Sequence, residues 1–120
     1  MRVRSYEDLE VWKEAIELVL EVYDGVDQFP AHERFAMSPQ LRRAAVSIPS
    51  NIAEGQSRSR KEFLHFLAIA RGSLQELVTL VIIAERRSYL TLERIAAIRD
   101  RSNRVGRLLS GLRRSLMKPL

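Results

Sequence analysis

The chain has 120 residues, 46% of them hydrophobic and 29% charged, which is typical of one folded domain and excludes a disordered segment. It contains no cysteine, so a disulfide framework and a thiolate metal site are excluded and a reducing cytoplasm is the expected compartment. The net charge of +5 is unevenly divided, because residues 1–60 have a balance of −2 and residues 61–120 one of +7. The longest apolar run, residues 80–84, is too short to predict a membrane span.

The first predicted helix covers residues 6–27, with Ser5 as its N-cap. Two apolar stripes follow it at helical spacing, about 120° apart around the axis. One stripe consists of Leu9, Trp12, Ile16, Val19 and Tyr23. The other consists of Val11, Ala15, Leu18 and Val22. Two apolar faces require two sets of partners, so we assign the second stripe to an interface with another subunit.

A second helix is predicted to begin at Ser38 and Pro39, an N-cap followed by proline at the first helical position. Its apolar residues keep their phase past Pro49 and are Leu41, Ala45, Ile48 and Ile52. Proline inside a helix removes one backbone hydrogen bond and bends the helix. The pattern therefore predicts a kinked helix that ends at Gly55 with a left-handed cap.

Two polar residues, Asn51 and Glu54, follow Pro49 closely. They could line a polar channel or bind a partner, or they could hold the backbone groups that the proline releases. Because side chains near caps and kinks commonly bond to local backbone, we favour the structural role for Pro49, Asn51, Glu54 and Gly55.

The third predicted helix covers residues 60–88, and its apolar residues alternate at intervals of four and three, which is typical of bundle packing. These residues are Phe63, Leu67, Ala70, Leu74, Leu77, Val81 and Ala84. The last part of the helix is apolar nearly all round. Leu80 and Ile82 are therefore predicted to extend the subunit interface.

The fourth predicted helix follows Thr91, its N-cap, and has one apolar side. The predicted fold is all-α: an antiparallel up-down four-helix bundle with a proline-kinked second helix, forming a single domain over residues 1–120. The opposite arc of the fourth helix carries Arg94, Arg101, Arg104, Arg107 and Arg114.

The arginine arc is the main candidate for function, because guanidinium groups spaced along one face could follow a phosphate backbone. Arg58 and Arg60 form a secondary basic patch. Only Tyr89 lies near these arginines in sequence, which favours contact with phosphate or with nucleic-acid shape over base stacking. Nucleic acid, with RNA favoured, is the expected partner.

The arginines could equally be present for reasons that involve no ligand. Residues 5–27 carry eight acids against Lys13 alone, so a basic fourth helix could simply neutralise an acidic first helix. A GC-rich genome would also favour arginine over lysine for no functional reason.

No constellation of catalytic or metal-ligating residues is apparent. The two histidines, His32 and His65, have no His, Asp or Glu three or four positions after them, and no nucleophile elbow or glycine-rich loop is present. We therefore expect no catalytic site, no metal and no cofactor.

The string QLRRAAVSIPSNIAEGQSRSRKEFLHFLAIARGSLQEL, followed by AERRSYL, resembles the four-helix-bundle family of 23S rRNA intervening-sequence proteins, also called the S23 ribosomal protein family. The matching motif positions are Arg42, Arg43, Pro49, Asn51, Glu54, Gly55, Glu62, Phe63, Gly72, Ser73, Leu74 and Glu76. The resemblance implies a ring-like homopentamer without enzymatic activity. It also implies a relation to accessory proteins of diversity-generating retroelements, which bind nucleic acid and a reverse transcriptase.

Two departures from the family pattern lie on the third helix and its exit. Val78 and Thr79 stand where the family often has a further glutamate, and Arg87-Ser88 stands where it often has Leu-Gly. As an alternative function, the bundle could be a protein-interaction scaffold that presents a ring surface to a partner such as a reverse transcriptase.

Overall fold

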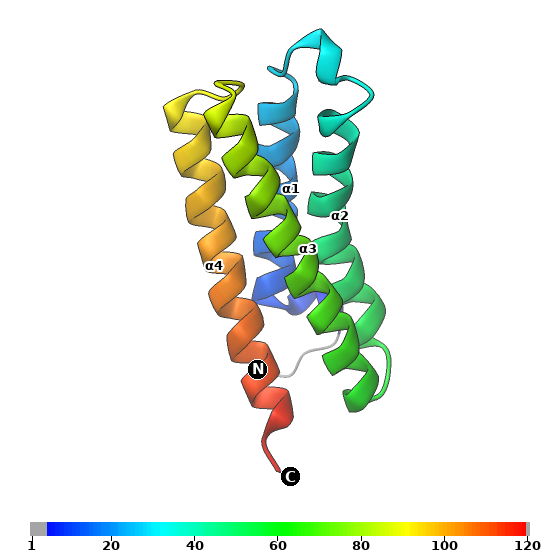
Figure 1. Ribbon diagram of the computed structural model, residues 1–120. Coiled ribbons are helices and arrows are strands. Elements are labelled where there is room, and N and C mark those ends of the chain that lie inside the picture. The colour runs from blue at the N-terminus through cyan, green and yellow to red at the C-terminus, as the bar shows by residue number, and fades with distance from the viewer. Residues whose placement is uncertain (1–4, 120) are drawn as a thin grey trace.

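The computed structural model describes residues 5–119 and is built from helices alone over that range. The four long helices are α1 (Glu10–Val26), α2 (Met37–Gln56), α3 (Arg60–Arg86) and α4 (Leu92–Met117). Two short 3-10 helices, η1 (Tyr6–Asp8) and η2 (Ala31–Glu33), precede α1 and α2. The long helices lie side by side, with the α1–α2 and α3–α4 connections at one end and the α2–α3 connection at the other (Figure 1). The predicted all-α class and four-helix bundle are confirmed.

The core is formed by the residues that repeat at helical spacing. All seven members of the stripe predicted on the third helix are buried, and α2 packs most extensively against α3. The largest side chains with no more than 1% of their surface exposed include Leu18, Leu41, Ile48, Ile52, Leu67, Leu77, Ile98 and Leu109. Periodicity therefore located the interior of α2 and α3 correctly. In α4 it located Ile95, Ile98, Val105 and Leu109, whereas Leu92, in the same helical phase, is 81% exposed.

The apolar stripe of α1 that packs in the core is the one that the sequence pattern assigned to a subunit interface. The residues that the sequence pattern assigned to another subunit, Val11, Ala15, Leu18 and Val22, are at most 3% exposed within a single chain. Leu80 is also buried, whereas Ile82 is half-buried. Because a side chain enclosed by its own bundle cannot contact a second subunit, the interface assignment is corrected for all but Ile82.

The N-terminal segment is interrupted where a continuous helix was expected. The hydroxyl of Ser5 accepts a hydrogen bond from the backbone N–H of Glu7 at 3.1 Å, so Ser5 is an N-cap, but of η1. Leu9 then adopts an extended conformation with ψ 128°, and α1 begins at Glu10.

α2 begins at Met37, earlier than predicted. The carboxylate of Glu33 accepts the backbone N–H of Met37 at 3.2 Å, which supplies the acceptor that a cap residue would provide. Ser38 therefore lies inside the helix and is buried, rather than acting as the N-cap. The helix runs on through Pro49 to Gln56.

Gly55 is not a left-handed cap, because it is helical and no described glycine has a positive φ. A Cβ atom at this position would lie 2.6 Å from the Cβ of Phe66 and 2.9 Å from Cδ1 of Phe63. Glycine is required here because α3 passes too close to α2 for any side chain.

α3 is the one described helix that is long and apolar enough to cross a membrane by length and composition alone. Its most apolar window has a mean hydropathy of 1.7 and is one-third buried inside the bundle. This is weak evidence for a membrane span, because the core helix of a soluble bundle meets the same criteria.

Candidate nucleic-acid interface

The arginines of α4 lie on two sides of the helix. α4 is fixed at its start by Thr91, whose hydroxyl accepts the backbone N–H of Arg94 at 3.1 Å. From there the helical phase places Arg94, Arg101 and Arg104 beside α1, where each forms ion pairs. Arg107 and Arg114 instead line a groove shared with α3. The single continuous arc expected from the sequence is therefore corrected to two separate surfaces.

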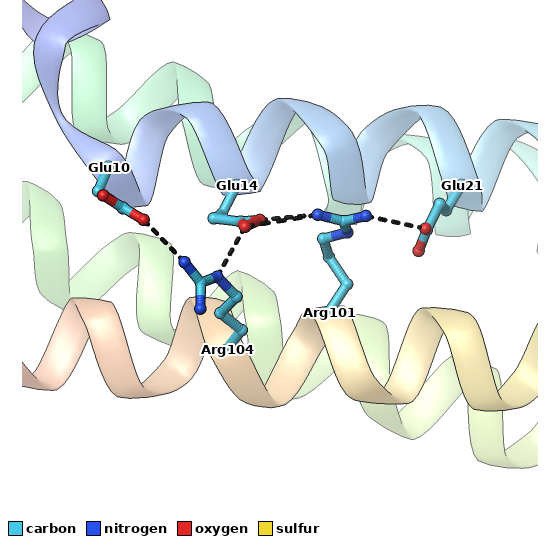
Figure 2. Close-up of polar contacts among 5 residues, drawn as sticks. All are labelled: Glu10, Glu14, Glu21, Arg101 and Arg104. Carbon is cyan, nitrogen blue, oxygen red and sulfur yellow. Dashed lines mark hydrogen bonds and ion pairs between the residues drawn. The ribbon is translucent and has the colours of Figure 1, made fainter.

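The first surface, here called the charge seam, joins Arg101 and Arg104 of α4 to Glu10, Glu14 and Glu21 of α1 (Figure 2). Nη1 of Arg101 lies 2.8 Å from Oε2 of Glu14, and Nη2 lies 3.3 Å from Oε1 of Glu21. Nε of Arg104 donates to Oε1 of Glu14 and Nη2 to Oε1 of Glu10, both at 2.7 Å. Glu14 thus accepts from both arginines.

The charge seam shifts the pKa values of Glu14, Arg101 and Arg104. The hydrogen bond from Arg101 lowers the pKa of the Glu14 carboxyl below its ordinary value, against the opposing effect of burial. Hydrogen bonds to Glu14 raise the pKa of Arg101 and of Arg104. Both guanidinium groups are therefore charged but already paired, and a phosphate would have to displace a carboxylate to reach them.

A weaker pair extends the same contact toward the end of the bundle. Arg94 lies 3.9 Å from Asp24, and the carboxylate is two-thirds exposed. The pairs also show that α1 and α4 run in opposite directions, because Glu10 faces Arg104 whereas Asp24 faces Arg94.

The second surface, here called the arginine groove, is an open cleft of about 770 Å³ between α3 and α4. Arg71 of α3 and Arg107 and Arg114 of α4 line it. No aspartate or glutamate is among its described lining residues, and none of the three arginines forms an ion pair within residues 5–119. The groove is thus a concentration of unpaired positive charge that is open to a ligand.

The secondary patch expected at Arg58 and Arg60 is occupied by contacts within the chain. Arg58 pairs with Glu54 and Glu62, and its guanidinium lies 5.1 Å from the centre of the Phe66 ring. Arg60 donates to the backbone carbonyls of Leu116 and Lys118 at the end of α4. Both arginines have structural partners, which leaves them poorly placed to contact phosphate.

The polar residues after Pro49 bond within α2 and to the connection that follows it. Nδ2 of Asn51 donates to the backbone carbonyl of Ser47 at 2.8 Å and lies 3.0 Å from its hydroxyl, which is itself 2.8 Å from the hydroxyl of Ser73. Ser47 therefore joins α2 to α3, and Asn51 bonds to Ser47 rather than to the carbonyl of Ala45 that Pro49 releases. Glu54 holds Arg58.

Arg71 was missed by sequence reasoning, which took its main candidate arginines from α4 and had Arg58 and Arg60 as its secondary ones. It lies three residues before Leu74, a core residue, and so at the edge of the buried side of α3. Only the pairing of α3 with α4 brings it into the same groove as Arg107. The sequence did contain an indication, because an arginine at the edge of an apolar stripe, such as Arg71, marks where the packed face of a helix ends.

The two histidines lie apart from both surfaces. Nε2 of His32 is 3.0 Å from the hydroxyl of Tyr89, which donates to Glu33 at 2.8 Å, and this hydrogen bond lowers the pKa of Glu33. Within residues 5–119 no three His, Cys, Asp or Glu side chains are grouped so that they could hold a metal ion.

The described residues form a small all-α bundle with a charge seam between α1 and α4 and an open basic groove between α3 and α4. Residues 7–111 match the family of 23S rRNA-intervening sequence proteins. The chain belongs to this family.

A solved structure is similar to the whole bundle. It is the crystal structure of a protein of unknown function from the S23 ribosomal protein family of Bacteroides thetaiotaomicron. The two chains superpose with a TM-score of 0.79 at 25% sequence identity, over 87% of this chain and 95% of that one. No curated protein matches the sequence.

Proposed function

We propose that this protein binds nucleic acid without catalysis, through phosphate contacts made by the arginine groove. The observation that carries the proposal is the set of three arginines that share an open groove with no carboxylate. We favour RNA over DNA because the family takes its name from an intervening sequence of 23S rRNA.

The contrast between the two arginine surfaces supports this choice of site. In the charge seam, each guanidinium has at least two carboxylate contacts, so its field is largely cancelled. In the arginine groove, Arg107 and Arg114 lie seven residues apart, or about 10 Å along the helix, with Arg71 on the other wall. Unpaired guanidinium groups at this spacing suit neighbouring phosphates and release counterions on binding.

The test is fluorescence anisotropy with a labelled RNA, at salt concentrations from about 50 to 200 mM. Arg71→Gln/Arg107→Gln/Arg114→Gln is expected to weaken binding at least about tenfold and to reduce the slope of log K against log salt by about 2 to 3. The matched control is Arg101→Gln/Arg104→Gln, which removes charge from the same helix but should retain the affinity of the wild type. Wild-type protein that does not bind at low salt, or equal losses in the two variants, would refute the proposal.

Self-association is a second candidate, because large apolar side chains remain exposed on the α1–α2 side. Leu20 is 54% exposed, Tyr23 41% and Val46 39%. A ring of identical subunits, five by family resemblance, would cover such side chains and could serve as a scaffold for a protein partner. Sedimentation velocity on the wild type and on Leu20→Glu tests this idea, and a wild-type monomer would exclude it.

A further inference from the structure

The arginine groove has the size and lining of a small-ligand site as well as a basic rim. Its volume of about 770 Å³ falls in the range of pockets that bind drug-sized molecules. The lining includes three apolar side chains, of which Leu74 and Leu109 belong to the core and Val78 packs against it. A Cβ atom at Gly106 would meet only Leu74, at 3.5 Å, so the space above this glycine is open. A phosphate bound only by the arginines at the rim would leave the interior of the groove empty.

The groove also contains a buried hydroxyl with no partner. Ser102 is 2% exposed, and its Oγ forms no hydrogen bond with any described residue. An unsatisfied buried polar group costs stability. Because Ser102 lines the groove but its Oγ has almost no accessible surface, a ligand would supply the missing bond once the side chain rotates toward the groove. Asn103 and Ser110 line the same groove and offer further donors and acceptors.

We infer that the arginine groove holds an unpaired nucleotide of a single-stranded RNA segment. A nucleobase has two apolar faces and an edge of donors and acceptors, which matches the apolar lining and Ser102. The phosphates on either side of this nucleotide would then contact Arg71 on one wall and Arg107 and Arg114 on the other. A duplex cannot fill the groove in this way, because its bases are stacked and paired.

This inference rests on the proposed function and adds to it a preference for single-stranded RNA. The test compares a labelled 12-nucleotide oligouridylate with a labelled 12-base-pair RNA duplex, using Gly106→Leu to fill the groove. The variant is expected to weaken binding of the single strand at least tenfold and to change binding of the duplex less than twofold. The matched control is Gly72→Leu, on the same pair of helices, since a Cβ at Gly72 has no neighbour within 4 Å.

A second variant separates binding from folding. Ser102→Ala removes the unpartnered hydroxyl, so its melting temperature should equal or exceed that of the wild type while its affinity for the single strand falls at least threefold. Loss of both properties would mean that Ser102 is structural and would overturn its assignment as a ligand contact.

The outcomes distinguish this inference from the proposed function. If wild-type protein binds neither probe, both fail. If it binds duplex and single strand equally and Gly106→Leu changes neither, phosphate binding stands and the nucleotide site is refuted. If Gly106→Leu changes the molecular mass measured by light scattering and not the RNA affinity, a second copy of the chain covers the groove and the inference is refuted.

Discussion

Arg101 of α4 and Glu14 of α1 are joined at 2.8 Å across the bundle, with the arginine side chain 30% exposed and the glutamate 15%. The contact links the first and last helices and removes Arg101 from the groups available to a ligand. Packing thus accounts for the charge of Arg101, whereas Arg107, six residues further on, has no carboxylate partner among the described residues.

The Arg101–Glu14 pair should contribute measurably to stability. Arg101→Ala is expected to lower the free energy of unfolding by about 1 to 2 kcal/mol, because it removes a partly buried, charge-assisted hydrogen bond. Urea denaturation of the two single variants and of Arg101→Ala/Glu14→Ala gives the coupling energy of the pair. Arg107→Ala is the matched control, with an expected change of less than about 0.5 kcal/mol. A coupling energy of zero would show that the pair contributes nothing.

Stability should also depend on pH through Glu14. Its folded-state pKa lies below the unfolded value, so the carboxylate contributes stability that is complete above the ordinary glutamate pKa of about 4.5 and is lost as the pH falls through the folded pKa. The urea midpoint of the wild type should therefore fall as the pH is lowered below this value. In Glu14→Gln the decline should be shallower, whereas Glu17→Gln, at an exposed position, should follow the wild type. Parallel curves for all three proteins would contradict the prediction.

Two glycines in helices should respond oppositely to the same substitution. Gly72→Ala is expected to stabilise the protein by about 0.5 to 1 kcal/mol, because alanine is the better helix former and its Cβ meets nothing within 4 Å. Gly55→Ala should destabilise it by about 1 to 3 kcal/mol, because the new Cβ would overlap Phe66 and Phe63. Differential scanning calorimetry of both variants checks the pair. Stabilisation by both substitutions would mean that α2 and α3 separate easily.

Ser88 should be replaceable by glycine with a gain in stability. It has a φ of 61° at the end of α3, where the backbone N–H of Tyr89 bonds to the carbonyl of Ala84 at 2.9 Å and that of Ser88 to Glu85 at 3.0 Å. This is the helix-ending motif in which glycine is preferred. Ser88→Gly is expected to add about 1 kcal/mol to the free energy of unfolding measured in urea. Ser88→Ala is the control and should give no such gain.

The fold could be predicted from the sequence more completely than the site. The phase of apolar residues in α2, α3 and α4 located the core, because a long helix in a small bundle must bury one stripe. α1 was harder, because it has two stripes of similar apolar character. The stripe with smaller residues, including Val11 and Ala15, packs inside, and the one with Trp12 remains partly exposed. Residue size, rather than hydrophobicity, decided between them.

The arginines of α4 divide between two surfaces because α1 lies beside one side of the helix and α3 beside another. Arg101 and Arg107 are six residues apart, which places them on different sides of a helix. Spacing alone could have separated them, but it could not show that the acids of α1 lie on one side and Arg71 on the other. The glycine at position 55 was misassigned for a similar reason, since its role depends on the approach of another helix.

The charge seam has a consequence for how the protein is made. Glu14 and Arg101 are separated by 87 positions, so the ribosome synthesises all of α2 and α3 between the acidic helix and its arginine partners. At about 5 to 20 residues per second, α1 emerges several seconds before Arg101. The acidic residues of α1 are therefore synthesised before the arginines of α4. The charge seam can close only after α4 has been synthesised, so the contact between the first and last helices is among the last that the chain can make.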